Sequence, residues 1–197
     1  MLKLKIKYLL YILVFLVSCN QKETRNTVDT NVQERNRSDS QFNLDNGVLF
    51  YKEEPYSGIV KSFYKTGELK AKSVYFKGKR NGFYNGWYEN GDVFFERFYK
   101  NGFKYGEHKG WYKNGQLSFV YYFNEVGEYN GEIKEWYENG QLLRAFNYVK
   151  GREEGSQKMW QSNGKIRANY VTKNGERFGL IGLKKCYTIN TENEVIQ

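Results

Sequence analysis

Residues 82–105 read GFYNGWYENGDVFFERFYKNGFKY, and the pattern in this stretch recurs along the chain. An aromatic residue four positions before a glycine occurs in five segments: FYKTG (63–67), WYENG (87–91), WYKNG (111–115), WYENG (136–140) and WQSNG (160–164). Their last glycines are separated by 24, 24, 25 and 24 residues. A second glycine series, at 58, 82, 106, 131, 155 and 179, contains the same one-residue insertion near residues 124–130. The chain is therefore a repeat array.

Each repeat has the pattern of a β-hairpin. Leu69 and Tyr75 stand six residues apart, and so do Val93 and Tyr99, which places each pair on one face of a strand. Asn-Gly between two such runs is a strong hairpin signal, because both residues tolerate a positive φ. One hairpin is only marginally stable, so neighbours must pair. The sequence predicts an all-β fold: an elongated antiparallel meander of about five 24-residue hairpins.

The repeat unit GxWYENGQLxxExxYKNGxxxG resembles the bacterial MORN-repeat variant over residues 58–179, and more weakly back to Tyr51. Repeats two to four match this unit well, whereas the fifth has Gln161 and Thr172 where aromatic residues are expected. The resemblance implies stacked hairpins in one twisted sheet, a role in protein interaction or contact with acidic lipid, and no catalysis. Members of this family are also labelled antitoxin components of toxin-antitoxin pairs.

The composition also disfavours an enzyme. The chain has 197 residues, 18% of them aromatic, but a single Pro and a single His. Residues that transfer protons or bind metals are therefore scarce. The sequence contains no P-loop, GxSxG or HExxH motif. We predict that the protein is not an enzyme, and we identify no catalytic, cofactor-binding or metal-binding residues.

Residues 1–18 have the pattern of an export signal. Three lysines at positions 3, 5 and 7 precede an apolar run over residues 8–17, which is too short to cross about 30 Å of hydrocarbon as a helix. Leu16-Val17-Ser18-Cys19 resembles the bacterial lipobox, so we expect a lipoprotein signal peptide and lipidation of Cys19. The alternatives are an ordinary signal peptide with an unmodified cysteine and a retained transmembrane helix. Removing residues 1–18 lowers the net charge from +9 to 9 − 3 = +6.

The remaining domain boundaries follow from composition and the repeats. Residues 19–46 are rich in polar and charged residues, so we predict a flexible tether, with an edge strand around Phe42 to Tyr51 as the alternative at its far end. Residues 47–57 look like a partial leading repeat, residues 58–179 hold the five repeats, and residues 180–197 form a C-terminal cap or tail. An atypical end repeat is common because it caps the stack.

The aromatic residues before the turns are the candidate binding surface. They are Trp87, Tyr88, Trp111, Tyr112, Trp136, Tyr137 and Trp160. Aromatic faces at a regular rise suit sugar rings, Pro-rich peptides or cations. The other interpretation is that these rings bury the core of a single-layer stack, and the two roles are compatible if one face stays open.

Charge is unevenly distributed along the array. Residues 58–81 sum to 7 − 1 = +6 and residues 155–178 to 5 − 1 = +4. The first repeat could therefore contact anionic lipid, or its lysines could serve solubility and edge protection. We expect no nucleic-acid binding, because the chain carries an export signal. His108, between Glu107 and Lys109, is expected to be solvated, and Cys186 is expected to be buried near residues 179–183 or paired between chains.

Together these features predict a non-catalytic, surface-anchored repeat scaffold that binds another protein in the bacterial cell envelope. The alternatives are a glycan or cell-wall binder that uses the aromatic ladder, and an antitoxin-like component. The expected location is a membrane of the envelope, reached through the lipid anchor, and the sequence does not specify which membrane. The partner is an unidentified envelope protein, with anionic lipid and cell-wall glycan as further candidates.

Overall fold

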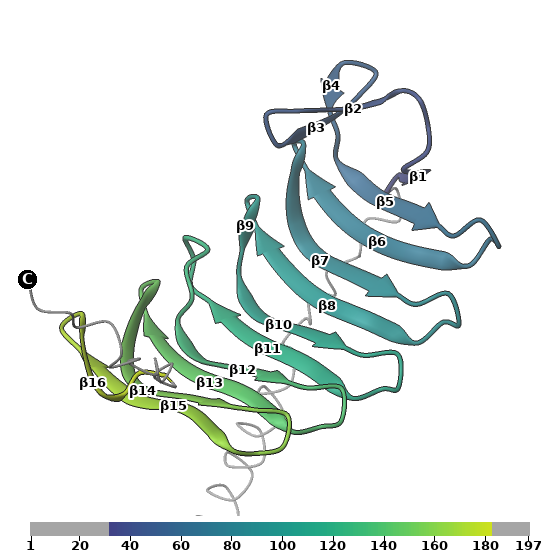
Figure 1. The fold of residues 1–197 in the computed structure, drawn as a ribbon. Helices are drawn as coiled ribbons and strands as arrows, with labels where there is room; N and C mark the ends of the chain where they lie inside the picture. Colours follow the sequence, from purple (N-terminus) through teal and green to yellow (C-terminus); the bar gives the residue numbers. More distant parts are fainter. Residues whose placement is uncertain (1–31, 183–197) are drawn as a thin grey trace, which may run out of the picture. The chain divides into compact units, whose positions relative to one another are not determined.

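The computed structural model describes residues 32–182, and this part of the chain is all β, as predicted (Figure 1). The strands are β1 (Glu34–Asn36), β2 (Phe42–Asp45), β3 (Val48–Tyr51), β4 (Glu54–Pro55), β5 (Gly58–Phe63), β6 (Leu69–Phe76), β7 (Lys79–Trp87), β8 (Val93–Lys100), β9 (Phe103–Lys104), β10 (Gly106–Trp111), β11 (Leu117–Phe123), β12 (Gly131–Trp136), β13 (Leu142–Val149), β14 (Arg152–Trp160), β15 (Ile166–Lys173) and β16 (Glu176–Leu180). No helix within the described residues is long and apolar enough to cross a membrane.

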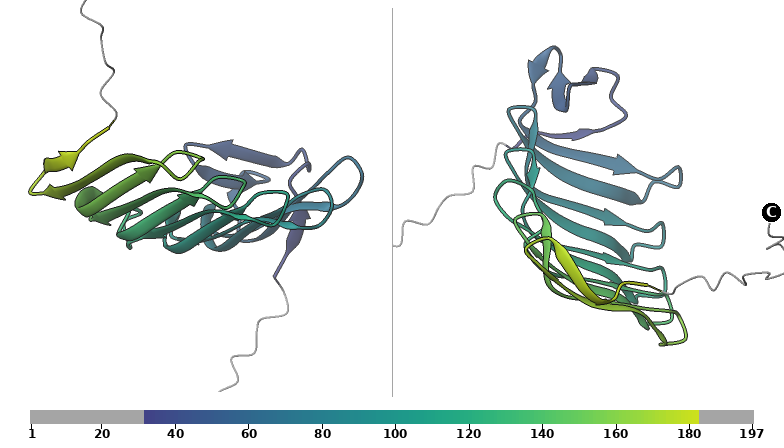
Figure 2. Two further views of the ribbon diagram at one scale, coloured as in Figure 1. Left: turned by 60° about the horizontal axis from the view of Figure 1, so that its bottom comes forward. Right: turned by 60° about the vertical axis from the view of Figure 1, so that its left-hand side comes forward.

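The repeats form one sheet, and their strands pair in sequence order. The 13-stranded sheet has the order β1-β5-β6-β7-β8-β10-β11-β12-β13-β14-β15-β16, with β9 paired to β8. The five predicted hairpins are β5–β6, β7–β8, β10–β11, β12–β13 and β14–β15, all antiparallel. Figures 1 and 2 show these strands as one twisted layer. The predicted antiparallel meander is confirmed.

Glycines set two kinds of turn, one at each end of the hairpins. In the WYENG turn, Gly91 N–H donates to Tyr88 O (2.9 Å) and Gly91 has a φ of 88°, which is a type I turn closed by a left-handed glycine. Asn90 is not left-handed there, and its Oδ1 instead accepts from the Asp92 N–H (3.1 Å). The prediction of two positive φ values is therefore wrong for this turn. It holds at the opposite end, where Asn101-Gly102 has φ values of 52° and 89°.

The one-residue insertion lies in a turn of the second group. Between β11 and β12, Asn124 N–H donates to Glu128 O (2.9 Å) and Gly127 N–H donates to Asn124 O (3.1 Å). This five-residue loop, closed by a left-handed Gly127, replaces the shorter turn of the other repeats. Because the extra residue is absorbed in the loop, the strands on both sides keep their pattern.

Large buried side chains of the repeats lie on one face of the sheet, which we call the core face. It is defined by the cross-strand pairs Val60–Ser73, Gly82–Tyr99, Tyr84–Arg97, Gly86–Phe95, His108–Tyr121, Gly110–Phe119, Ile133–Phe146, Gln157–Tyr170 and Gly155–Thr172. Ile133 and Gln157 are completely buried. Gly86 and Gly110 leave room for the rings of Phe95 and Phe119, which would overlap any Cβ at these glycines.

Cationic side chains cover the aromatic rings of the core face. The Arg97 guanidinium lies 4.3 Å from the ring centre of Phe95, and Arg80 lies 4.6 Å from that of Tyr84. The same contact joins Lys104 to Phe123, Arg144 to Phe146 and Arg177 to Tyr170. Each is a cation–π contact that also shields the ring with the apolar stem of the long side chain. A single-layer sheet buries its rings in this way without a second layer.

His108 is buried on the core face, so the prediction of a solvated histidine is wrong. Its side chain is only 2% exposed and stands between the rings of Tyr99 and Phe123. Its Nε2 lies 2.8 Å from the carbonyl oxygen of Phe98, so this nitrogen carries the proton. Gln157 occupies the equivalent place two repeats later, and its Nε2 donates to Asn147 O (2.8 Å). A buried polar side chain at this position therefore bonds to the preceding strand.

The tether prediction is wrong from Glu34 onward. The polar strand β1 pairs in parallel with β5, and β2, β3 and β4 form a separate three-stranded sheet. Phe42 is 8% exposed and joins a buried cluster that the sequence did not suggest, made of Phe42, Leu49, Tyr56, Val60 and Tyr75. The prediction from composition failed because β1 is held by backbone hydrogen bonds, which do not need apolar side chains. Residues 1–31 lie outside the described range.

Residues 47–57 do not add a hairpin to the array. They supply β3 and β4 of the small sheet, which is attached to the first repeat by Leu49 N–H to Gly78 O (2.8 Å) and Gly78 N–H to Tyr56 O (2.8 Å). At the other end, β16 pairs with β15 and all five of its residues are exposed. The predicted cap therefore overlaps β16 at Leu180, and residues 183–197, including Cys186, lie outside the described range.

We expect acid to destabilise the fold through His108. Burial lowers the pKa of His108 from 6.5 to about 4, with Arg97 and Lys104 nearby acting in the same direction. Between these pKa values the unfolded chain binds a proton that the folded chain does not, so stability should fall as pH drops from 6.5 to 4. The full difference is about 3 kcal/mol.

The His108→Gln variant is the matched control, because glutamine makes the equivalent hydrogen bond at position 157. Urea unfolding of both proteins at pH 7 and pH 4.5 measures the effect. The loss of stability between these pH values should be smaller in the variant, and equal losses in the two proteins would contradict the assignment.

Candidate interaction surface

The face opposite the core face carries mainly charged side chains, with aromatic side chains in the second and third hairpins. We call it the open face and define it by Ile59, Lys61, Lys72, Phe83, Asn85, Glu96, Phe98, Glu107, Lys109, Tyr122, Lys134, Lys158 and Val171, which alternate in sequence with residues of the core face. Phe83 is 63% exposed and Val171 49%. Exposed apolar side chains gathered on one surface are typical of interaction sites.

One row of the open face shows how the repeats differ. Two residues before the last residue of the first strand, the five hairpins have Lys61, Asn85, Lys109, Lys134 and Lys158 in turn. The residues paired with them on the second strands are Lys72, Glu96, Val120, Ala145 and Asn169. The second hairpin is the exception, because it has a neutral amide in place of lysine and a carboxylate beside it.

A groove lies on the open face at this exception. It has a volume of about 480 Å³ and is lined mainly by Phe83, Asn85, Glu96, Phe98, Tyr105, Glu107 and Lys109. It lies beside the junction of β8 and β10, which pair at only two positions, Lys109–Glu96 and Gly110–Phe95. These residues were not predicted as a site from the sequence, although the break in the lysine row was a signal that could have indicated them.

The tyrosines of the predicted ladder join successive repeats. The hydroxyl of Tyr88 donates to the backbone carbonyl of Trp111 (2.7 Å), one repeat further along. The equivalent bonds are Tyr64 to Trp87 (2.8 Å), Tyr112 to Trp136 (2.9 Å) and Tyr137 to Trp160 (3.1 Å). Burial raises the pKa of Tyr88, which keeps the hydroxyl protonated as a donor. The tyrosines therefore tie the repeats together.

The tryptophans of the ladder are neither fully buried nor fully open. Trp87, Trp111, Trp136 and Trp160 are the last residues of β7, β10, β12 and β14, and each is half-buried. They lie near the WYENG turns, away from the groove at Phe83 and Phe98. The structure therefore places the predicted residues in a row along the array, each in a different repeat. Their role in binding stays a prediction.

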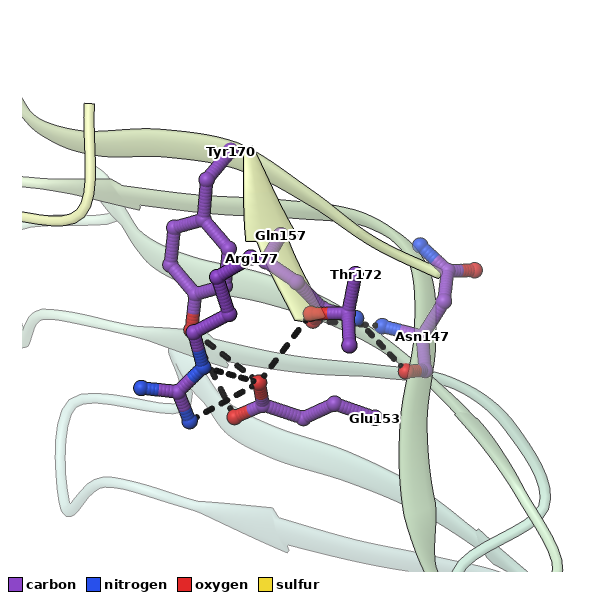
Figure 3. Close-up of polar contacts among 6 residues, drawn as sticks. All are labelled: Asn147, Glu153, Gln157, Tyr170, Thr172 and Arg177. Carbon is purple, nitrogen blue, oxygen red and sulfur yellow. Dashed lines mark hydrogen bonds and ion pairs between the residues drawn. The ribbon is translucent and has the colours of Figure 1, made fainter. Parts of the chain in front are cut away.

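The carboxylates of the core face are held by the chain's own donors. Glu153 accepts hydrogen bonds from Tyr170 (3.3 Å), Thr172 (3.3 Å) and Arg177 (3.0 Å), which joins β14 to β15 and β16 (Figure 3). Glu135 accepts from Tyr121 and from Arg144 (2.6 Å). Burial raises the pKa of both Tyr121 and Tyr170. Because these side chains hydrogen-bond to one another, their role is structural.

The described residues contain no group of three or more His, Cys, Asp or Glu side chains that could hold a metal ion. His108 is buried with its Nε2 against Phe98 O. In the groove, the ammonium of Lys109 is paired with the carboxylate of Glu107.

Two segments of the chain match the MORN repeat variant family model, residues 56–77 and residues 129–150. Each match contains one hairpin of the array, β5–β6 in the first and β12–β13 in the second. Their starts are 129 − 56 = 73 residues apart, which equals three repeat intervals of 24, 24 and 25 residues. MORN repeats are β-hairpin repeats that generally act as scaffolds for protein or membrane interaction and are generally non-catalytic. No curated protein matches the chain at a significant level.

We expect the tyrosine ladder to stabilise the array. Tyr88→Phe keeps the ring and removes the hydroxyl, which leaves the half-buried Trp111 carbonyl without this donor. The free energy of unfolding should fall by about 1 kcal/mol, the usual net contribution of one hydrogen bond. Urea denaturation measures the change.

Tyr105→Phe is the control, because Tyr105 stands outside the ladder. Tyr112→Phe should behave as Tyr88→Phe does. If both ladder variants are as stable as the parent protein, the ladder does not contribute to stability.

Proposed function

We propose that the protein is a non-catalytic repeat scaffold, anchored in the bacterial cell envelope, that binds a partner protein through its open face. The observation that carries this proposal is the exposure of Phe83, at 63%, and of Tyr122, at 39%, beside charged side chains of the open face. A monomer has no need to expose such side chains together, whereas an interaction surface combines aromatic anchors with a polar surround. The match of two segments to MORN repeats supports the same class of function.

The absence of catalysis is supported by the arrangement of polar groups. The partly buried carboxylates of Glu135 and Glu153 each lie against an arginine. Such pairs hold their charges fixed, whereas a catalytic acid or base must exchange a proton at working pH. The repeats thus supply surface and spacing, which suits a scaffold.

The envelope location rests on the N-terminal sequence. Residues 1–18 have an export pattern that ends in Leu-Val-Ser-Cys, and Cys19 is the residue that would carry lipid. Fourteen residues lie between Cys19 and Glu34, the first residue of β1. A folded array on such a connection would meet partners close to the membrane.

We expect Cys19→Ala to move the protein from the membrane fraction to the soluble fraction, because it removes the only group proposed to carry lipid. Cell fractionation followed by immunoblotting measures the distribution. Cys186→Ala is the matched control and should leave the protein in the membrane fraction. Membrane association that persists in Cys19→Ala would refute the anchor.

A photo-crosslinking amino acid at Tyr122 tests for a protein partner. Tyr122 is 39% exposed on the open face and lies outside the groove. We expect irradiation of cells to give one defined adduct with an envelope protein. The same group at Val126, which is 61% exposed in the β11–β12 loop, should not give this adduct.

The alternative of glycan binding gives a different result. Retention on purified peptidoglycan that is lost in Trp111→Ala and Trp136→Ala, without a protein adduct at Tyr122, would overturn the proposal in favour of the aromatic ladder as a sugar-binding site.

A further inference from the structure

The second hairpin lacks a cation that the other four repeats supply. Two residues before the end of the first strand, the other hairpins have Lys61, Lys109, Lys134 and Lys158, whereas the second hairpin has Asn85. Its cross-strand partner is Glu96, where the other hairpins have Lys72, Val120, Ala145 and Asn169. All five repeats form the same antiparallel hairpin whichever residue stands here, so folding does not require this exception. Asn85 and Glu96 therefore form an acidic interruption in the row of lysines.

The polar end of the groove has acceptors that the chain does not use. The Oδ1 atom of Asn85 is buried and has no hydrogen-bond partner within residues 32–182. Glu96 is exposed and forms no ion pair with any lysine or arginine in that range. Lys109 stands on the other side of Glu96, but its ammonium pairs with Glu107 and lowers the pKa of that carboxyl. A cationic donor from outside the chain would reach the exposed Glu96 carboxylate.

The other end of the groove is aromatic. The rings of Phe83 and Phe98 meet edge to face with their centres 5.0 Å apart, and Phe98 lies 6.1 Å from Tyr105. Phe83 and Asn85 are two residues apart on β7, as are Glu96 and Phe98 on β8, so the rings lie directly beside the free acceptors. An aromatic surface next to a carboxylate and an amide oxygen suits a flat, cationic hydrogen-bond donor.

We propose that this groove binds an arginine side chain of the partner protein. The guanidinium donates to the exposed Glu96 carboxylate, and its plane stacks on Phe83. The partner thus supplies the cation that the other repeats carry as lysine. This inference deepens the proposed function and rests on it, because it assigns the partner's chemistry. Charge complementarity favours a cation over an acidic or neutral group, since Lys109, the cation opposite Glu96, forms its ion pair with Glu107 and Glu96 forms none within residues 32–182.

The test uses the full chain and a blocked peptide, acetyl-Gly-Gly-Arg-Gly-Gly-amide, titrated by NMR. The matched control is the same peptide with citrulline in place of arginine, because citrulline has the shape of arginine but no charge. We expect the arginine peptide to shift signals of the groove, and the citrulline peptide to bind roughly five- to tenfold more weakly. Equal binding of both peptides, or a stronger response to tetra-N-acetylchitotetraose, would overturn the proposal.

Two variants and one control locate the site. Asn85→Lys restores the residue of the other repeats and should reduce binding of the arginine peptide at least tenfold, because the new ammonium pairs with Glu96. Glu96→Gln should have a similar effect without a new cation. Lys158→Asn makes the reverse exchange in the fifth hairpin and should leave binding unchanged. Thermal unfolding of each variant verifies that it is folded, and unchanged binding in folded Asn85→Lys would refute the site.

The crosslinking experiment separates this inference from the proposed function. If Asn85→Lys loses the adduct formed at Tyr122, both are supported. If the adduct persists in Asn85→Lys, the scaffold stands and the arginine site is refuted. If the arginine peptide binds selectively but no adduct forms with the parent protein, the groove is a site for arginine and the scaffold proposal fails.

Discussion

A single layer of sheet can bury apolar surface only if its own side chains cover one another. In this protein the covering is done by large rings on the core face and by long cationic side chains that lie across them, such as Arg80 over Tyr84 and Arg97 over Phe95. Gly86 and Gly110 leave space for the rings opposite them. This constraint explains why the chain is so rich in aromatic residues, and it leaves the opposite face free of a packing role.

Stability in such an array comes from contacts between neighbouring repeats. The backbone ladder, the bonds from each tyrosine to the next tryptophan carbonyl, and the polar contacts of His108 and Gln157 all join adjacent strands or adjacent repeats. A change on the open face of one repeat therefore has little effect on the others. The second hairpin can carry Asn85 and Glu96 in place of the basic residues of its neighbours, and a groove forms at that point.

The five hairpins, their order and the position of the insertion were predicted correctly, because glycine spacing and period-two alternation act over a few residues. The conformation of the WYENG turns was not, because Asn90 bonds to the Asp92 N–H and leaves the left-handed position to Gly91. His108 was assigned to solvent because its sequence neighbours are charged, yet alternation turns them to the open face and His108 to the core. Strand β1 was missed because a polar segment can pair through its backbone alone.

The repeat length, the hairpin architecture, the strand order and the scarcity of catalytic residues are properties of the sequence alone, since each depends on local conformation or on composition. Which face is buried, how the first repeat is covered by the small sheet, and where Phe83, Asn85 and Glu96 form a groove depend on the folded sheet. The reason is physical: burial and unpaired acceptors arise from residues on different strands, and their distances are set by register, twist and the limited pairing of β10 with β8.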